Sequence, residues 1–352
     1  METTPISEIA TALPLNVVTQ DDVRRAIERV HEGRPEVTRL LKIFASCGVE
    51  KRHFAFPLEY YCAGRGFERR NADYLEEGVK LAERAARACL RNARIEPNQI
   101  DHLIFVTTTG LATPSVDALL VRRLGLRADV RRSPLFGLGC AGGAGALVRA
   151  NDVLRGHPND RVLVVDLELA GQVFSTRAAD PVDMVGAALF GDGAAAAVVS
   201  GDRAPGPDGP VIRAVRSVLF SDTEDMMGWK FTSDGMRLQL SERVTGFVRE
   251  RLGPEVGRFL AENSMPPGHL RFWILHPGGR KILEAYRDAL SLGADALQWS
   301  RSSLANVGNL SSASVLFILE DVVSLGRPRD GDRGFLIALG PGFASEMLLL
   351  NW

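Results

Sequence analysis

The chain has 352 residues, 45% of them hydrophobic and 24% charged, and a formal net charge of −1. This balance is typical of a globular protein with room for two fused domains, and it argues against nucleic acid as the main partner. The four cysteines are widely spaced without a C-x-x-C pair, which argues against a disulfide framework and a zinc site and suits a reducing cytoplasm. We expect no metal, no signal peptide and no membrane span, because no apolar run is long enough to cross a bilayer.

The first hundred residues predict one strand and three helices. A basic cluster of Lys51, Arg52 and His53 lies between the second and third helices. We expect this cluster to lie in a solvated loop, and the alternative is an electrostatic landing site for a phosphorylated substrate. Hydrophobic spacing predicts the strand at 5–13 and the helices at 21–30, 37–47 and 71–92.

A glycine-dense corner with a central cysteine follows. Residues 133–150, SPLFGLGCAGGAGALVRA, predict a strand, a tight turn and a helix, with Cys140 at the N-terminus of the helix. The free N–H groups and the positive end of a helix dipole favour a thiolate at such a place. Cys140 is therefore a candidate nucleophile, and the alternative is a structural cysteine packed in a buried turn.

The same corner spells G-x-G-x-x-G through Gly137, Gly139 and Gly142, and Asp166 ends the next apolar strand. This pattern is typical of a dinucleotide-binding fold, but it belongs near the start of a βαβ unit. More than 130 residues precede it here. A dinucleotide-dependent oxidoreductase is thus kept as an alternative.

The second half of the chain resembles the first in layout, which suggests an internal duplication. The segment RAPGPDGP, at 203–210, is the best candidate boundary, and we predict halves at 1–205 and 206–352. Strands that alternate with helices predict a mostly parallel sheet covered on both faces. The predicted strands after residue 99 are at 100–107, 161–166, 187–200, 269–274, 333–339 and 345–350.

Two further turns carry chemistry. His276 ends a buried strand before Pro-Gly-Gly, and Asn309 lies in NVGNLSSAS ahead of an apolar helix. Singly, His276 is expected to be a core histidine, Asn309 a turn former, and Ser311 and Ser312 helix caps. Together with Cys140, however, they supply a nucleophile, a base and a polarising amide at the ends of strands, where open α/β sheets build their sites.

Five motifs, in this order and spacing, resemble type III polyketide synthases, the chalcone synthase-like family: GLGCAGGAGAL, ALFGDGAAAAVV, WILHPGGRKIL, GNLSSASVLFILED and LGPGF. The resemblance extends over about residues 5–350. It implies an α/β thiolase fold, an αβαβα five-layered sandwich of two similar halves, working as a homodimer. It also implies a Cys140–His276–Asn309 triad that uses acyl-CoA and malonyl-CoA without a metal or redox cofactor, so that the G-x-G-x-x-G match is coincidental.

The resemblance implies a decarboxylative condensation. Cys140 and His276 would rest as a thiolate–imidazolium pair, and the thiolate would take an acyl group from a starter acyl-CoA. His276 and Asn309 would then stabilise the enolate that forms when malonyl-CoA loses carbon dioxide. The enolate would attack the acyl-Cys140 thioester, and the grown chain would be released by cyclisation to a pyrone, a resorcinol or a related ring.

Pocket positions follow from the same resemblance. Phe190 matches an aromatic gatekeeper between the CoA tunnel and the cavity, and Leu238 stands where a second gatekeeping phenylalanine is common. Lys42 matches a residue that holds CoA phosphates, whereas a neighbouring arginine position is Ala45, for which Arg280 is a candidate substitute. The remaining implied substrate-binding positions are Ala170 and Val173 in place of cavity threonines, Thr113 reaching the partner's cavity, and Thr108, Ser311 and Gly278.

These small, apolar substitutions favour a fatty acyl-CoA starter, as in the bacterial alkylpyrone and alkylresorcinol synthases, which residues 226–241, MMGWKFTSDGMRLQLS, also resemble. The alternative within enzymes is a ketoacyl-acyl carrier protein synthase III-like condensing enzyme, which shares the Cys/His/Asn set. A further alternative is a catalytically inactive scaffold that binds acyl-CoA.

Overall fold

A computed structural model describes residues 4–173, 180–204, 206–232 and 235–352. In this part of the chain nine strands form one continuous sheet in the order β11-β12-β13-β8-β1-β7-β6-β4-β5. The strands are β1 (Thr4–Ala12), β4 (His102–Val106), β5 (Arg131–Leu135), β6 (Arg161–Leu169), β7 (Asp192–Ser200), β8 (Val211–Leu219), β11 (Phe272–Leu275), β12 (Arg333–Gly340) and β13 (Ala344–Asn351).

The sheet consists of two halves with the same order. In the first half β4 is parallel to β6, and β6, β7 and β1 then pair antiparallel. In the second half β11 is parallel to β12, and β12, β13 and β8 pair antiparallel. The repeated order supports the internal duplication, while β5 adds a parallel edge strand to the first half alone. The boundary at 205/206 stays a prediction.

The expected mostly parallel sheet is wrong, because each half closes with antiparallel strands. A tight turn at 341–343 folds β13 directly back on β12, so the chain reverses direction without a crossover helix. The halves meet where Thr4 and Pro5 of β1 pair with the start of β8. The sheet is therefore mixed, with parallel pairs confined to its outer parts.

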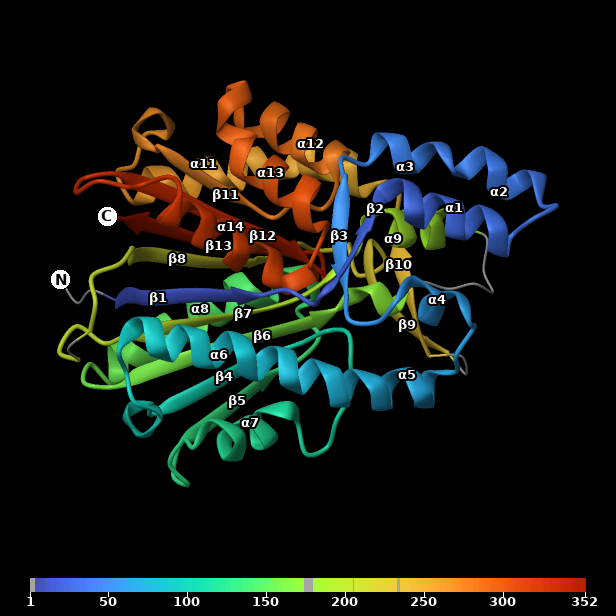
Figure 1. Cartoon of the computed structure of the whole chain (residues 1–352). Coiled ribbons are helices and arrows are strands. Elements are labelled where there is room, and N and C mark those ends of the chain that lie inside the picture. Colours follow the sequence, from blue (N-terminus) through green and yellow to red (C-terminus); the bar gives the residue numbers. More distant parts are fainter. Residues whose placement is uncertain (1–3, 174–179, 205, 233–234) are drawn as a thin grey trace.

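Two helices lie between the halves of the sheet, and others cover its outer faces (Figure 1). The central helices, α8 (Gly142–Gly156) and α14 (Ser314–Ser324), share one apolar core with strands of both halves. The outer faces are covered by α6 (Val79–Ala93) and α7 (Val116–Leu124) on the first half and by α11 (Gly253–Glu262), α12 (Arg280–Leu290) and α13 (Gln298–Val307) on the second. This confirms the predicted five layers.

The remaining elements gather at one end of the sheet, at the right of Figure 1. The capping box at Thr19 starts the first helix where predicted, whereas the helix expected at 37–47 is split in two. These elements are α1 (Gln20–Val30), α2 (Pro35–Leu40), α3 (Lys42–Ser46), α4 (Leu58–Cys62), α5 (Phe67–Asp73), α9 (Pro181–Leu189), α10 (Val244–Phe247), and the hairpins β2 (Asn16–Thr19)–β3 (Lys51–Phe54) and β9 (Met227–Thr232)–β10 (Gly235–Leu240).

The prediction that the basic cluster at 51–53 lies in a solvated loop is wrong. The cluster is part of β3. Pairing with β2 makes side chains alternate in and out, so Arg52 is buried while Lys51 is exposed. The helix expected at 71–92 begins earlier, as α5, and passes into α6 through a π-helical turn at Tyr74–Gly78. No described helix is long and apolar enough to cross a membrane.

Candidate active site

Cys140 lies where the sequence predicts it, in a turn between a strand and a helix. β5 ends at Leu135, and a single 3₁₀ turn, η3 (Gly139–Ala141), leads directly into α8. The Cys140 side chain is partly accessible, and its Sγ lies 3.6 Å from Ser311 Oγ. A serine from the C-terminal half is therefore the nearest recorded partner of the thiol.

Asn309 lies between α13 and α14, and its side chain is oriented by Ser311. The Ser311 backbone N–H donates to Asn309 Oδ1 at 2.8 Å. Because an N–H group only donates, the bonded atom is the carbonyl oxygen, and the NH₂ group points the other way. Within the described residues this NH₂ group has no hydrogen-bond partner. It is thus available to donate to a substrate oxygen.

His276 follows β11, and its backbone N–H donates to Ile337 O of β12 at 3.0 Å. The end of β12 at Gly340 packs against the turn that carries Cys140, because a Cβ on Gly340 would lie 2.8 Å from Ala141 Cβ. His276 and Cys140 are thereby placed at the same end of the sheet. His276 Nδ1 is buried and has no partner among the described residues.

Burial sets the protonation of both groups. It raises the pKa of the Cys140 thiol to about 12, against a smaller opposing effect of the Ser311 hydroxyl, and it lowers the pKa of His276 to about 3. Burial therefore favours a neutral thiol and a neutral imidazole, and the thiolate–imidazolium resting pair stays a prediction. Two buried carboxyls, Glu168 and Asp166, add to the pKa of the thiol because they disfavour another negative charge nearby.

These carboxyls form a hydrogen-bonded cluster beneath the site. Ser312 Oγ lies 2.7 Å from Asp166 Oδ1 and 2.5 Å from Glu168 Oε1. A hydroxyl has one proton to donate, so both contacts are hydrogen bonds only if one carboxyl is protonated. Glu168 also accepts from Thr108 N, Thr108 Oγ1 and Thr109 Oγ1. We therefore assign the charge to Glu168 and the proton to Asp166, which donates to Ser312.

This cluster, Asp166–Glu168–Ser312–Thr108, reaches the thiol in two steps. Thr108 Oγ1 lies 3.2 Å from Ser311 Oγ, which in turn contacts Cys140. Burial raises the pKa of Asp166 well above its ordinary value and raises that of Glu168. Asp166 is thus a buried partner of Ser312 and not the ribose-binding acid of a dinucleotide fold.

The two expected gate residues lie next to each other. Phe190 follows α9 and forms a parallel bridge with Asn309, and Leu238 lies on β10. Both side chains contact the same glycine of α9, since a Cβ on Gly186 would lie 3.5 Å from Leu238 Cδ2 and 3.7 Å from Phe190 Cδ2. The geometry fits a paired gate, and the gating role itself stays a prediction.

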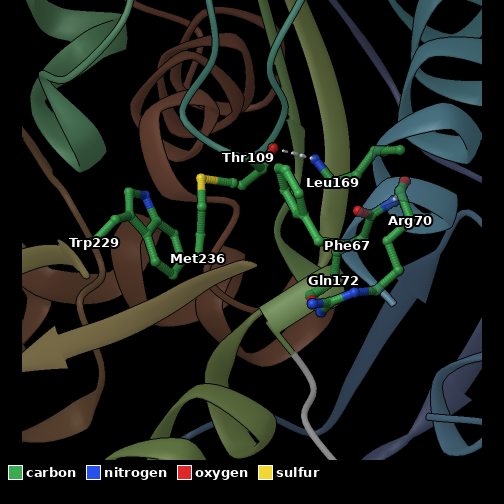
Figure 2. A pocket seen from close by; sticks show the side chains of 7 residues that line it. All are labelled: Phe67, Arg70, Thr109, Leu169, Gln172, Trp229 and Met236. Carbon is green, nitrogen blue, oxygen red and sulfur yellow. Dashed lines mark hydrogen bonds between the residues drawn. The ribbon is translucent and has the colours of Figure 1, made fainter. Parts of the chain in front are cut away.

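A narrow cavity of about 20 Å³ lies beside the carboxyl cluster, and Figure 2 shows its lining. Thr109 connects the two, because its Oγ1 donates to Glu168 and accepts from Leu169 N at 3.0 Å. Ala170 follows Leu169 and is buried, whereas the side chain of Val173 lies outside the described part of the structure. The lining residues are Phe67, Arg70, Thr109, Leu169, Gln172, Trp229 and Met236.

Lys42 lies in a second, open pocket of about 470 Å³ on α2 and α3, shared with Arg34 and Arg39. The lining contains no acidic residue; it consists of Gly33, Arg34, Pro35, Thr38, Arg39 and Lys42. Ala45, where the resemblance places an arginine, is exposed and is not among the residues that line this pocket.

The other predicted positions have simpler surroundings. The Arg280 backbone N–H donates to Cys47 O at 3.0 Å, which places Arg280 at the end of α3, with an exposed side chain. The Gly278 N–H donates to His276 O at 3.0 Å and so shapes the histidine turn. Thr113 is exposed on the loop before α7, and its contact with a partner chain stays a prediction. The described ranges contain no group of three metal-ligating side chains.

Several site residues have only a weak signal in the sequence. Asp166 and Glu168 alternate in a strand that is otherwise apolar, which marks two carboxyls on one buried face. In the sequence, nothing distinguishes Arg52 from an arginine in an exposed basic loop. Trp229 and Met236 belong to a polar hairpin whose contact with the cavity depends on the tertiary fold.

Comparison with known proteins now gives the family. The family model described as chalcone and stilbene synthases, N-terminal domain, matches residues 3–203, and the C-terminal domain model matches residues 212–352. The chain is 42% identical to a 1,3,6,8-tetrahydroxynaphthalene synthase of Streptomyces peucetius, over 99% of this chain and 93% of that protein. It is 30% identical to the phloroglucinol synthase of Pseudomonas fluorescens, over 96% of each.

The fold comparison agrees. The crystal structure of the Streptomyces coelicolor 1,3,6,8-tetrahydroxynaphthalene synthase, described as a bacterial type III polyketide synthase, superposes with a TM-score of 0.94 at 30% identity and covers 99% of each chain. This chain belongs to the chalcone and stilbene synthase family and is a type III polyketide synthase, an acyltransferase-type enzyme with a thiolase-like fold.

Proposed function

We propose that Cys140, His276 and Asn309 carry out a decarboxylative Claisen condensation between an acyl-CoA starter and malonyl-CoA. The observation that carries this proposal is that Ser311 holds the carbonyl oxygen of Asn309, which leaves the Asn309 NH₂ group unpaired, and also contacts the Cys140 thiol. A donor next to a nucleophile is what acyl transfer and enolate formation both need. No metal or redox cofactor is required, because malonyl-CoA supplies its own leaving group.

The first step loads the starter. Because burial favours the neutral form of both groups, His276 takes the thiol proton as Cys140 Sγ attacks the thioester carbonyl of the acyl-CoA. The carbon–sulfur bond to CoA then breaks, and the imidazolium returns the proton to the departing CoA thiolate. The acyl group remains as a thioester on Cys140.

The second step forms the carbon nucleophile. The thioester oxygen of malonyl-CoA accepts hydrogen bonds from the His276 imidazole and from Asn309 Nδ2. These bonds stabilise the enolate oxygen as the bond to the carboxylate breaks and carbon dioxide leaves. The enolate carbon attacks the acyl-Cys140 carbonyl, Cys140 leaves, and a β-ketoacyl-CoA extended by two carbons results.

We propose a short starter acyl-CoA, malonyl-CoA included, and a small polyhydroxylated aromatic product. The named products of two relatives, tetrahydroxynaphthalene and phloroglucinol, carry oxygen on alternate carbons, as chains built from two-carbon units do. The fatty acyl-CoA starter and a pyrone or resorcinol product, favoured by Ala170 and Leu238, form the second candidate.

We assign the basic pocket around Lys42 to the phosphates of CoA, supported by its three cations and its lack of acids. We also propose a homodimer in which Thr113 lies at the partner's cavity. The protein is further proposed to be cytoplasmic, which its four unpaired cysteines support.

Product analysis tests the function. The enzyme is incubated with malonyl-CoA alone, and then with malonyl-CoA plus acetyl-, hexanoyl- or palmitoyl-CoA, and released compounds are identified by mass spectrometry. An aromatic product from malonyl-CoA alone supports the short-starter proposal. A pyrone or resorcinol that forms only with the long starters supports the second candidate. No product with any CoA ester, but turnover with acyl carrier protein thioesters, would contradict both and favour the ketoacyl synthase alternative.

A further inference from the structure

Arg52 of β3 is a fully buried cation whose recorded hydrogen-bond partners are all neutral oxygens. Its Nη1 donates to Ala187 O at 2.8 Å and to Phe190 O at 2.9 Å. Its Nη2 donates to Ala188 O at 2.8 Å and to Gln20 Oε1. No described carboxylate lies within ion-pair distance of Arg52, although a buried arginine is ordinarily paired with one.

The position of these oxygens explains why the charge is tolerated. Ala187 and Ala188 belong to the last turn of α9, where carbonyl groups lack partners within the helix and carry the negative end of its dipole. The guanidinium satisfies two such oxygens at once, together with the carbonyl oxygen of Phe190 just after the helix. Burial lowers the pKa of Arg52 to about 10, so the side chain is still charged at neutral pH.

The same short segment holds Asn309. The Asn309 backbone N–H donates to Leu189 O at 2.8 Å, and the Gly191 N–H donates to Asn309 O at 3.1 Å. Arg52 bonds the residues on both sides of Leu189, namely Ala188 and Phe190. The Arg52 guanidinium and the backbone of Asn309 therefore both bond to the same short segment at the end of α9.

Glycines allow the two segments to approach this closely. A Cβ on Gly308 would lie 2.8 Å from Leu189 O, and one on Gly191 would lie 2.6 Å from Val307 O. The Arg52 Cβ would lie 3.5 Å and 3.3 Å from these two positions. Because neither glycine has a side chain, the two segments are in direct backbone contact. The position of Asn309 therefore depends on the contacts that hold the end of α9 in place.

We propose that Arg52 is a positioning residue for malonyl-CoA decarboxylation, which fixes the end of α9 and through it the amide of Asn309. Arg52 itself touches no reacting atom. The thiol shares its contact with Ser311 with Asn309, but the turn that carries the thiol is also held by the end of β12. A displacement of the asparagine by a fraction of an ångström should weaken the bond to the enolate oxygen and leave loading intact. This inference rests on the proposed function.

The test separates the two steps in the full-length enzyme. Loading is followed as the rate at which intact-protein mass spectrometry detects acylated Cys140 with acyl-CoA alone. Decarboxylation is followed as release of carbon dioxide from malonyl-CoA. For Arg52→Met, which keeps the length of the chain but removes the charge, we expect about a tenfold or greater loss of decarboxylation kcat, a KM within about threefold, and loading within about threefold of the wild type.

Two further variants serve as controls. Lys51→Met removes an exposed cation from the neighbouring position of β3 and should leave both rates unchanged. Arg52→Lys keeps the charge but cannot bond all the carbonyls, so it should recover part of the lost decarboxylation. It also replaces Arg52→Met as the test variant if the latter does not fold, with decarboxylation then expected to fall more than loading.

Equal losses of loading and decarboxylation would show a merely structural role and overturn the inference, as would two unchanged rates. These outcomes leave the proposed function standing, because the wild type still performs both steps. If the wild-type enzyme releases no carbon dioxide from malonyl-CoA, the proposed function and this inference are both overturned.

Discussion

Two buried charged clusters lie behind the reactive side chains, and they are held in opposite ways. The Arg52 guanidinium behind Asn309 is bonded to the free carbonyls of a helix end and keeps its charge. The carboxyls of Asp166 and Glu168 behind Cys140 face each other across Ser312, and one of them must be neutral. The first cluster is a fixed charge, and the second is a titratable one.

This difference follows from what surrounds each charge. Helix-end carbonyls are neutral acceptors whose dipoles favour a cation, and the buried carboxyl of Asp192 favours the charge of Arg52 from a distance beyond that of an ion pair. A second carboxylate has the opposite effect on Asp166, because like charges a few ångströms apart cannot both ionise in a buried site. We therefore expect the half-reaction that depends on Asn309 to be insensitive to pH, and the half-reaction that depends on Cys140 to be sensitive to it.

The largest expected effect separates the two half-reactions. Asn309→Ala removes the donor to the enolate oxygen and should lower carbon dioxide release from malonyl-CoA by about 100- to 1000-fold, while Cys140 still becomes acylated. Asn306→Ala, an exposed asparagine three residues earlier, is the matched control and should stay within about threefold. A parallel loss of acylation in Asn309→Ala would mean that the two clusters do not support separate steps.

The pH dependence of the thiol is the next effect in size. Because burial and the two carboxyls raise the pKa of Cys140 to about 12, the thiolate fraction should rise about tenfold per pH unit between about pH 6 and pH 9. Alkylation of Cys140 by iodoacetamide, followed by intact mass with Cys140→Ala as the blank, measures this rise. An alkylation rate that does not change over the same pH range would show that Cys140 is already a thiolate, as in the thiolate–imidazolium pair.

A second basic group, the exposed Arg39, sharpens the contrast with the buried Arg52. Arg39 lines the pocket of Lys42, and its charge is free to meet phosphates. Arg39→Ala should raise the KM for malonyl-CoA about three- to tenfold and leave kcat unchanged, with a smaller difference at high salt. Arg24→Ala removes an ion-paired surface arginine of α1 and should change neither constant. An unchanged KM in Arg39→Ala would place the CoA phosphates elsewhere.

The smallest expected effect is on stability. The raised pKa of Asp166 means that the folded chain keeps a proton which the unfolded chain releases above about pH 4. Stability should therefore fall as pH rises, by up to about 1.4 kcal/mol per pH unit, until the pKa in the folded state is reached. The side chain at position 166 in Asp166→Asn is neutral at every pH. The free energy of unfolding of Asp166→Asn should therefore increase relative to that of the wild type between about pH 5 and pH 8. A constant difference would show that Asp166 is ionised in the folded state.

The turns that hold the candidate catalytic residues could be predicted from sequence because their signals are local, whereas the catalytic roles stay predictions. Cys140, His276 and Asn309 each stand in a short glycine-containing turn between a strand or helix and the next helix, and the motifs fix their order. The five layers were predicted from the resemblance to the family and not from the alternation of strands and helices. The mixed sheet was not predicted, because strand direction depends on the short turn at 341–343 and not on hydrophobic spacing.

The supporting clusters could not be predicted, because their burial is decided far away in the sequence. Arg52 is covered through the pairing of β3 with β2 and by α9, more than 130 residues later. The role of Asp166 depends on Ser312, which lies 146 residues further along the chain. A basic triplet and an acidic strand end have the same appearance whether they are solvated or buried.

The most direct test of the central claim is the covalent intermediate on Cys140. The enzyme is mixed with a series of acyl-CoAs, examined by intact-protein and peptide mass spectrometry, and then given malonyl-CoA. We predict one acyl adduct on Cys140, absent in Cys140→Ala, that disappears on addition of malonyl-CoA as an extended product is released. An adduct that forms equally in Cys140→Ala, or that malonyl-CoA leaves in place, would contradict the assignment of Cys140 as the nucleophile of a condensing enzyme.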